Sequence, residues 1–509
     1  MKLFAKFTTL LLAIAVLPLS LFSCSTAPAP SAPADQSQDA APITVTEEYL
    51  ITCPSGDKVA SRLARSIKYA LRDELGMTLT LKEDFLIDPS QIPEKEILVG
   101  ETDREESVKA YESLGENQWS VTAENGKIVI AGKGTIALKD AIQHFISTYI
   151  SGKTAVNVEA NMAHHSESPF YSFSWSDGEL IDTGVKDGGY PRLYSLKDGT
   201  LLLGCDGMTV YRSTDYGMTW EKPVHASQKQ KGTANAAFIQ TEDGTVYLGF
   251  RSTYHNADGS FYSSIQVSYS TDNGRTWKKH STVYENTEAD GRYNGVWEPH
   301  FGMMNGKLTC FYANDSSNVT TYQNIEYKQW DPEAGEWTNR TIVCNGEDHK
   351  SRDGMPVWQQ LSTGEYVCVI EAWNKDDNDR FAIQLTYSED GVEWSKPVTV
   401  MRPLKTGTVC AAPYIVELPN GQLVISCQTN ERNEEGNDTL YMGTVISDGT
   451  PVSLLTEKNF SAHDYPYYDQ PTTTSYMWNG MYVYGYYLFA CATGPNGIRL
   501  NRIDFTKND

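Results

Sequence analysis

Two glutamates stand in apolar segments, where a carboxylate is costly to bury without a partner or a chemical role. Glu298 lies in the sequence Val-Trp-Glu-Pro-His, and Glu371 lies in Val-Ile-Glu-Ala-Trp. Two carboxyl groups that face each other can hydrolyse a glycosidic bond: one donates a proton to the leaving oxygen, and the other attacks the anomeric carbon or activates water. The alternative interpretation, two acids in structural bonds to Arg192 or Arg251, stays open.

A repeated hairpin pattern predicts the elements that position these glutamates. Beyond residue 170, an apolar run, a turn ending in glycine and a second apolar run recur six times. The turn glycines are Gly199, Gly244, Gly306, Gly364, Gly421 and Gly480. One such sheet cannot bury both of its faces, so we expect the six units to pack radially into a six-bladed β-propeller. The predicted fold class is therefore mainly β.

A second repeated pattern, Ser-x-Asp-x-Gly-x-x-Trp, supports this period. Full copies run from Ser213 to Trp220 and from Ser270 to Trp277, and shortened copies end at Trp337 and Trp394. In a turn between outer strands, Asp can bond the turn backbone and Trp can cover the edge of a blade. We therefore expect these residues to be structural.

The propeller would bring the two glutamates to one end of the ring. There, the start of each innermost strand and the end of its hairpin partner surround the axis, and Glu298 and Glu371 occupy these positions on adjacent blades. The tryptophans at this end could be platforms for sugar rings, although each is equally compatible with blade packing. The candidate substrate-binding residues are Arg192, Asn235, Arg251, Trp297, Asp353, Trp358, Gln428 and Gln470.

The repeats and the motifs at this end resemble those of known glycosidases. The Ser-x-Asp pattern resembles the Asp box of the sialidase superfamily. The order of the other motifs resembles glycoside hydrolase family 93, the exo-acting α-L-arabinanases. These motifs are Tyr190-Pro191-Arg192, Trp297-Glu298-Pro299, Gly354-Met355-Pro356, the strand-ending Glu371 and Ala411-Ala412-Pro413-Tyr414. The resemblance implies a retaining mechanism with Glu298 as acid/base and Glu371 as nucleophile.

Two other functions remain open. An exo-α-sialidase would use an arginine cluster, for which Arg192, Arg251 and Arg352 are available, and a tyrosine, for which Tyr467 or Tyr468 is available. Against it, the first sialidase arginine usually precedes its proline by two residues, whereas Arg192 follows its proline. A non-catalytic glycan-binding propeller would instead have the two glutamates far apart or both in salt bridges.

The N-terminus has the form of an export signal. Lys2 and Lys6 precede an apolar run, and Cys24 follows a small residue in a segment that resembles a bacterial lipobox. Residues 1–23 are therefore predicted to be a lipoprotein signal peptide, with lipidation of the Cys24 thiol. Residues 24–42, rich in Ala, Pro and Ser, are predicted to be a tether. The expected location is a lipid anchor at the bacterial cell surface or on the outer or periplasmic membrane face.

Residues 43–165 are predicted to form a small α+β domain before the propeller at residues 170–509. Helical spacing of apolar residues extends from Val59 to Leu75, with Gly76 placed to end the helix, and Asn125-Gly126 indicates a hairpin. This segment resembles the small non-catalytic domain that precedes the catalytic domain in β-hexosaminidases and α-glucuronidases.

Composition favours a glycan as the partner over a nucleic acid. The formal charge of −23 would repel phosphates and forgo counterion release, whereas neutral sugars are unaffected. Apart from Cys24, the cysteines show no Cys-x-x-Cys spacing and no clustered histidines. We therefore predict no metal site, disulfide framework or cofactor.

Overall fold

The computed structural model describes residues 42–186, 188–288, 295–315, 322–374, 381–434 and 437–507. The predicted signal peptide, Cys24 and all of the tether except its last residue lie outside the described residues. Within the described part, none of the helices combines the length and the apolar character that crossing a bilayer requires.

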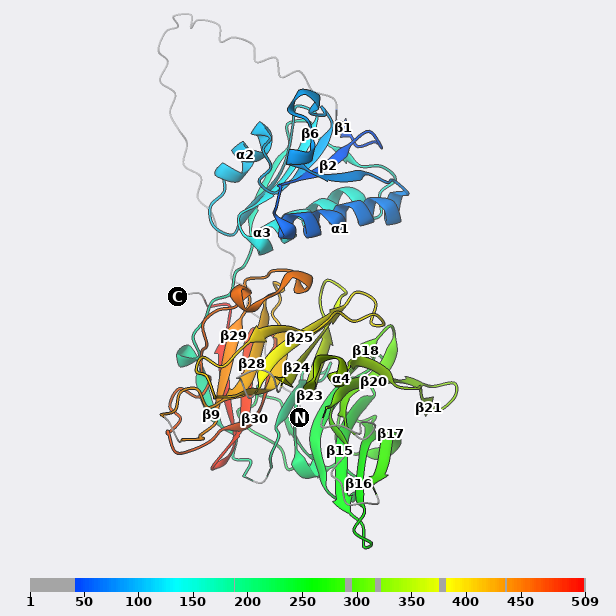
Figure 1. Ribbon diagram of the computed structural model, residues 1–509, viewed down its shortest axis with the longest axis vertical. Coiled ribbons are helices and arrows are strands. Elements are labelled where there is room, and N and C mark those ends of the chain that lie inside the picture. The colour runs from blue at the N-terminus through cyan, green and yellow to red at the C-terminus, as the bar shows by residue number, and fades with distance from the viewer. Residues whose placement is uncertain are drawn as a thin grey trace, which may run out of the picture. The chain divides into compact units, whose positions relative to one another are not determined.

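The first described segment contains a six-stranded mixed sheet with the strand order β3-β2-β4-β6-β5-β8 (Figure 1). In this order the strands are Thr80–Glu83, Leu50–Cys53, Glu96–Val99, Lys127–Gly132, Gln118–Glu124 and Ala163–Glu167. A two-stranded sheet joins β1 (Ile43–Thr44) to β7 (Asn157–Val158). The helices are α1 (Lys58–Leu75), α2 (Glu105–Glu112) and α3 (Thr135–Phe145).

Local sequence explains the borders of α1 and of the hairpin. Asp57 caps the start of α1 by accepting a hydrogen bond from the amide of Ala60, and Gly76 ends the helix with a φ of 66°. Asn125 and Gly126 both have positive φ in the turn between β5 and β6. The expected α+β pattern is present in this segment, with one face of α1 buried against the sheet and α3.

The rest of the described chain forms six antiparallel sheets, each a blade of a β-propeller. Blade one contains β10 (Arg192–Ser195), β11 (Leu201–Cys205), β12 (Thr209–Ser213) and β13 (Val224–His225). Blade two contains β14 (Thr233–Gln240), β15 (Val246–His255), β16 (Phe261–Ser270) and β17 (Lys278–Glu288). Blade three contains β18 (Val296–Met304), β19 (Lys307–Asn314), β20 (Asn324–Asp331), β21 (Glu336–Trp337) and β22 (Thr341–Cys344).

The remaining blades follow the same plan. A short helix, α4 (Gly346–His349), precedes blade four, which contains β23 (Ser351–Gln360), β24 (Tyr366–Asn374), β25 (Ala382–Ser388) and β26 (Val398–Met401). Blade five contains β27 (Cys410–Glu417), β28 (Leu423–Thr429) and β29 (Tyr441–Ile446). Blade six contains β30 (Met477–Tyr484), β31 (Tyr487–Gly494), β32 (Gly497–Asp504) and β9 (Glu179–Asp182). The prediction of a mainly β, six-bladed propeller is confirmed.

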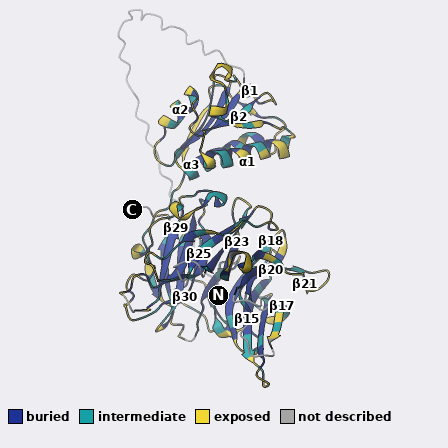
Figure 2. Cartoon of the chain, viewed as in Figure 1, coloured by how far each residue is buried: buried dark blue, intermediate teal, exposed yellow. Residues whose placement is uncertain are grey.

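The ring closes because a strand from the start of the propeller segment pairs with the last blade. β9, which precedes blade one in the sequence, pairs with β32 as the outermost strand of blade six. Most strand residues of the blades are buried (Figure 2). Closure of this kind holds the six inner strands around one axis, which fixes the positions of the side chains at its end.

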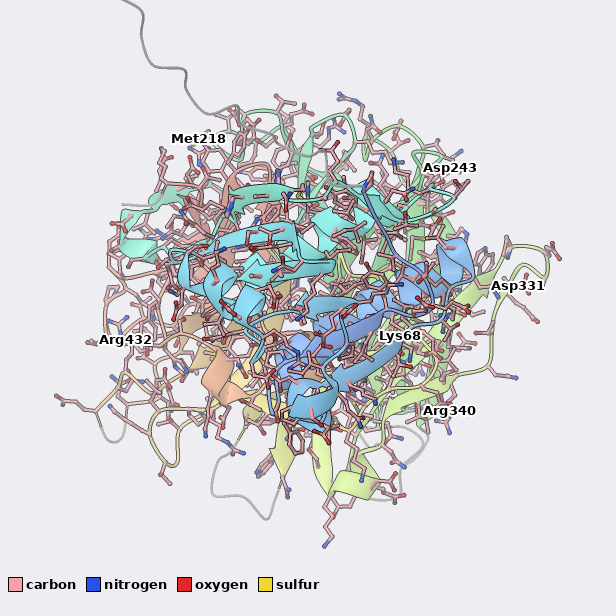
Figure 3. The ribbon with its side chains drawn as sticks, turned by 90° about the horizontal axis from the view of Figure 1, so that it is seen from above. Lys68, Met218, Asp243, Asp331, Arg340 and Arg432 are labelled. Carbon is pink, nitrogen blue, oxygen red and sulfur yellow. The ribbon has the colours of Figure 1, made fainter. Side chains whose placement is uncertain are left out.

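The Ser-x-Asp turns have the structural role that the sequence predicts. Asp272 accepts hydrogen bonds from the Ser270 hydroxyl and from the amide and hydroxyl of Thr276, while buried Trp277 donates to the Gly274 carbonyl. In the shortened third copy, Asp331, which is labelled in Figure 3, accepts hydrogen bonds from the amides of Glu333 and Ala334 in its own turn. These aspartates therefore stabilise turns.

The sixth hairpin differs from the prediction. Gly480 lies inside β30, and the turn to β31 falls at Gly485, which has a φ of 61°. The Asn479-Gly480 pair has the residue types of a turn, but no turn forms there. Glycine is required at position 480 by close packing, because a Cβ would lie 3.1 Å from Nη1 of Arg192. The alignment of blade six therefore shifts relative to the other five.

Candidate active site

Each of the six blades carries one residue with a left-handed φ at the start of its inner strand. These residues are Tyr190, Asn235, Glu298, Met355, Ala412 and Trp478. In five of the blades, the ladder between the inner strand and its hairpin partner shifts register at this residue. A bulge of this kind redirects a side chain. Glu298 thus occupies one of six equivalent positions around the axis.

The hairpin partners supply a second set of residues beside the bulges. Glu371 pairs with Gly354, Arg251 with Ala234, and Gln428 with Ala411. The same position is filled by Asp206 in blade one, whose amide donates to the Gly189 carbonyl, and by Thr493 in blade six. Asp206, Arg251, Glu371 and Gln428, each seven residues after its turn glycine, therefore occupy equivalent positions, whereas Tyr487, seven residues after Gly480, lies at the opposite end of β31 from Thr493.

Glu298 has an environment that favours the protonated acid. The residue as a whole is half-buried, but its carboxyl oxygen Oε2 is fully buried and has no hydrogen-bond partner among the described residues. Burial raises the pKa of Glu298 to about 7, and the nearby charges of Glu371 and Asp315 act in the same direction, against Arg251 and Arg352. At neutral pH this carboxyl is able to donate a proton.

Glu371 is held in a single orientation by two hydrogen bonds. Its Oε1 accepts from Nη1 of Arg352 at 2.8 Å, and its Oε2 accepts from the amide of Ala412 at 2.9 Å. The facing residue is Gly354, where a Cβ would come within 3.0 Å of Glu371 Oε1. The site thus contains one charge-paired, oriented carboxylate and one carboxyl that favours its proton.

Further charged groups surround Glu298. The guanidinium of Arg251 lies 5.2 Å from the ring centre of Trp297, and the Trp297 indole donates to Asp315 at 3.3 Å. Asp206 accepts from the amide of Asn235 at 3.0 Å, and burial raises the pKa of Asp206 despite that bond. Of the candidate substrate-binding residues, Asn235, Arg251 and Trp297 lie at the end of the axis that carries Glu298, together with Asp206 and Asp315, which were not among the candidates.

Trp478 is a site residue that sequence reasoning missed. Its side chain is 38% exposed, its ring stacks on Tyr190 with centres 5.7 Å apart, and its amide donates to Oε1 of Gln428 at 2.7 Å. Gln428 therefore orients the bulge that carries this exposed ring. The predicted turn at Gly480 concealed Trp478, because Trp478 then stands within the turn. Gln470, the candidate from this blade, instead donates to the carbonyls of Leu440 and Thr474.

Three other candidates are buried in structural positions. Trp358 is 1% exposed and donates to the His300 carbonyl, so it is not a sugar platform. Asp353 is equally buried and pairs with Ala372 on the neighbouring strand. Arg192 donates through Nη1 to the carbonyls of Pro191, Trp478 and Asn479. Within the described residues, Arg192 forms no ion pair.

The arginine cluster of the sialidase alternative is incomplete. Arg251 and Arg352 both influence Glu298, but Arg192 is engaged with backbone carbonyls, and the hydroxyl of fully buried Tyr467 donates to the Arg499 carbonyl. In the part of the chain that the structure describes, no group of three or more His, Cys, Asp or Glu residues could hold a metal ion.

Comparison with solved structures places the propeller among known folds. The α-L-arabinofuranosidase of Fusarium graminearum in complex with an iminosugar inhibitor aligns with a TM-score of 0.50 at 20% identity, covering 66% of this chain and 99% of that one. A protein of unknown function from Dyadobacter fermentans aligns with a TM-score of 0.50 at 15% identity, covering 65% and 98%.

A third solved structure is the α-L-arabinanase of Penicillium chrysogenum complexed with arabinobiose, with a TM-score of 0.46 at 21% identity, covering 67% and 99%. Searches of protein-family models and of curated proteins returned no match. At these identities the likeness concerns the fold.

Proposed function

We propose that this propeller is a retaining exo-glycosidase that removes α-L-arabinofuranosyl units or arabinobiose from the ends of glycan chains. The observation that carries the proposal is the unequal state of its two carboxyls on adjacent blades: Glu298 favours its proton, and Glu371 is a carboxylate paired with Arg352. The similarity to an arabinofuranosidase that binds an iminosugar supports the choice of sugar.

In the first step, Glu371 attacks the anomeric carbon while Glu298 donates its proton to the leaving oxygen, giving a covalent glycosyl ester on Glu371. In the second step, Glu298 removes a proton from water, which attacks the anomeric carbon and releases Glu371. The two inversions at the anomeric carbon retain its configuration.

The electrostatics of the pair suit this change of role. The negative charge of Glu371 raises the pKa of Glu298, so esterification of Glu371 removes one of the causes of the raised value. Glu298 therefore loses its proton more readily in the glycosyl-enzyme, and the resulting carboxylate is the form that can accept a proton from water. Arg352 positions Glu371, and exposed Trp478 offers an aromatic face to a sugar ring.

We further propose that the enzyme acts outside the cytoplasm, held to a bacterial membrane by a lipid on Cys24, as the N-terminal sequence predicts. The test is fractionation of cells that express the full chain. The wild-type protein should sediment with membranes, and Cys24→Ala should move it to the soluble fraction; wild-type protein in the soluble fraction would contradict the anchor.

The function is tested by measuring the sugars that the protein releases from arabinan, sialosides and host glycans. We expect arabinose or arabinobiose from the wild type and none from Glu298→Gln or Glu371→Gln. Release of sialic acid would instead support the sialidase alternative. Binding to a glycan without release of sugar would indicate a binding propeller.

A further inference from the structure

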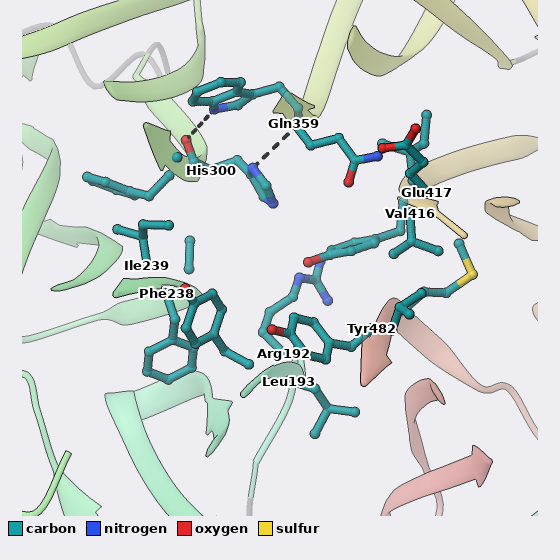
Figure 4. Close-up of a pocket in the computed structure, with 18 of the residues that line it drawn as sticks. Arg192, Leu193, Phe238, Ile239, His300, Gln359, Val416, Glu417 and Tyr482 are labelled. Carbon is teal, nitrogen blue, oxygen red and sulfur yellow. Dashed lines mark hydrogen bonds between the residues drawn. The ribbon is translucent and has the colours of Figure 1, made fainter. Parts of the chain in front are cut away.

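A cavity lies on the propeller axis, lined by the six inner strands. It has a volume of about 330 Å³, and its lining residues all follow the bulges on the six inner strands (Figure 4). Tyr190, Met355 and Ala412, three of the bulge residues, pack together as one buried cluster at the start of these strands. The cavity is therefore distinct from the site of Glu298 and Glu371.

The cavity contains a buried positive charge. Arg192 is 6% exposed and lies between the rings of Tyr190 and Tyr414, at 4.0 and 5.2 Å from their centres. Its Nη1 is bound by three carbonyls, while its Nε and Nη2 bind no described residue. A guanidinium buried without an anionic partner is costly, and an anion in the cavity would offset this cost.

One neutral hydrogen-bond donor faces the same space, and a second lies buried in its wall. The amide of Trp358 donates to Nδ1 of His300 at 3.4 Å, which places the ring proton on Nε2. Burial, assisted by the charge of Arg192, lowers the pKa of His300 to about 3, so the ring is neutral. Nε2 of Gln359, a residue that lines the cavity, is buried, points toward Glu417 and has no partner among the described residues, so the side-chain amide must rotate to present Nε2 to an anion (Figure 4).

We propose that this axial cavity binds a small monovalent anion, a halide or a short carboxylate, between Arg192, the Nε2–H of His300 and the side-chain amide of Gln359. A single guanidinium balances one negative charge, which favours a monovalent anion. The carboxylate in the lining, Glu417, accepts hydrogen bonds from the amide and hydroxyl of Ser362, at 2.8 and 2.6 Å. The remaining volume can hold several waters, at about 30 Å³ each.

The anion would stabilise the inner-strand bulges that carry the active-site residues. Arg192 binds the carbonyls of Trp478 and Asn479 and stacks on Tyr190, so fixing the guanidinium also fixes two of the bulges. This proposal concerns stability and does not depend on which glycan, if any, the protein cleaves.

The first test is thermal unfolding at constant ionic strength, with sodium bromide or sodium formate replacing sodium gluconate, whose anion is bulky. We expect the melting temperature of the wild type to rise with the logarithm of the bromide or formate concentration. Arg192→Met should abolish this rise, and Gln359→Leu should raise the apparent Kd about tenfold. If Arg192→Met does not fold, the bromide-dependent rise in melting temperature is compared between the wild type and Gln359→Leu.

The matched control is Arg72→Gln, which removes a positive charge from an arginine whose side chain is 55% exposed. It should respond to bromide as the wild type does. Equal responses to gluconate and bromide, or an unchanged bromide response in Gln359→Leu, would overturn the proposal.

The second test locates the anion in crystals soaked in bromide. We expect an anomalous peak in the axial cavity within contact distance of Arg192 and His300. Bromide peaks confined to the protein surface would show an adventitious ion only and would refute the site.

Discussion

Replacing Glu298 by glutamine should stabilise the folded protein while it removes activity. Glu298 has a pKa of about 7 in the folded protein against an ordinary value of 4.5, because it is buried. The folded state therefore binds this proton more tightly than the unfolded state does. Stability is highest below pH 4.5, falls as the pH rises from 4.5 to about 7, and is constant above that range.

The size of the effect follows from the pKa difference. Raising a carboxyl pKa from 4.5 to about 7 corresponds to a loss of about 3 kcal/mol of folding free energy once the pH is well above 7. Glutamine is neutral at every pH and keeps the shape of the side chain. Glu298→Gln should therefore be more stable than the wild type by about 3 kcal/mol at pH 8, with little of this difference at pH 4.5.

The assay is urea unfolding of both proteins at pH 4.5, 6 and 8, together with kcat/KM for glycan cleavage. Loss of a general acid should lower kcat/KM by about 10²–10⁴-fold. The control is Glu159→Gln, which removes one carboxylate from an exposed position outside the propeller. A Glu298→Gln protein that gains no stability between pH 4.5 and 8 would refute a buried, proton-holding Glu298, and one with full activity would refute its role as acid.

Two further predictions concern the aromatic platform and the structural turns. Trp478→Ala should raise KM about 2–10-fold with a smaller change in kcat, since an aromatic contact contributes about 0.5–1.5 kcal/mol, and Trp478→Phe should recover part of the loss. Steady-state kinetics on arabinan oligosaccharides measure both effects. An unchanged KM in Trp478→Ala would show that Trp478 does not contact the substrate. Asp272→Ala should destabilise the protein by about 1–3 kcal/mol with KM unchanged. Burial raises the pKa of Asp272, but hydrogen bonds from Thr276 and Ser270 outweigh burial and lower this pKa to about 2. The contribution of Asp272 to folding stability is therefore present above pH 3.8 and is lost as the pH falls through 2. Urea unfolding at pH 7 measures it, and a stable variant with altered KM would contradict a purely structural role.

The sequence carried enough information for the blades because each turn leaves a local signal. Five of the six turn glycines stand where the structure has a hairpin turn with positive φ. The exception, Gly480, has the residue type of a turn but is required by the approach of Arg192. A glycine needed for close packing and a glycine needed for a turn are indistinguishable in one sequence.

The site was predictable where it depended on register and unpredictable where it depended on side-chain direction. Counting from the turn glycine placed Glu371 and Arg251 correctly, because cross-strand pairing is regular between the turn and the bulge. After the bulge, neighbouring side chains turn to opposite sides. Arg192 and Trp358 therefore face the axial cavity and the blade core instead of the carboxylates.

The central claim is that Glu371 forms a glycosyl ester while Glu298 transfers protons. It is tested most directly by incubating the protein with an activated 2-deoxy-2-fluoro-α-L-arabinofuranoside and mapping the labelled peptide by mass spectrometry. The account predicts a covalent adduct on Glu371 that is absent in Glu371→Gln and still forms in Glu298→Gln, because an activated leaving group needs no proton. An adduct on another residue, or glycan hydrolysis with inverted anomeric configuration, would contradict it.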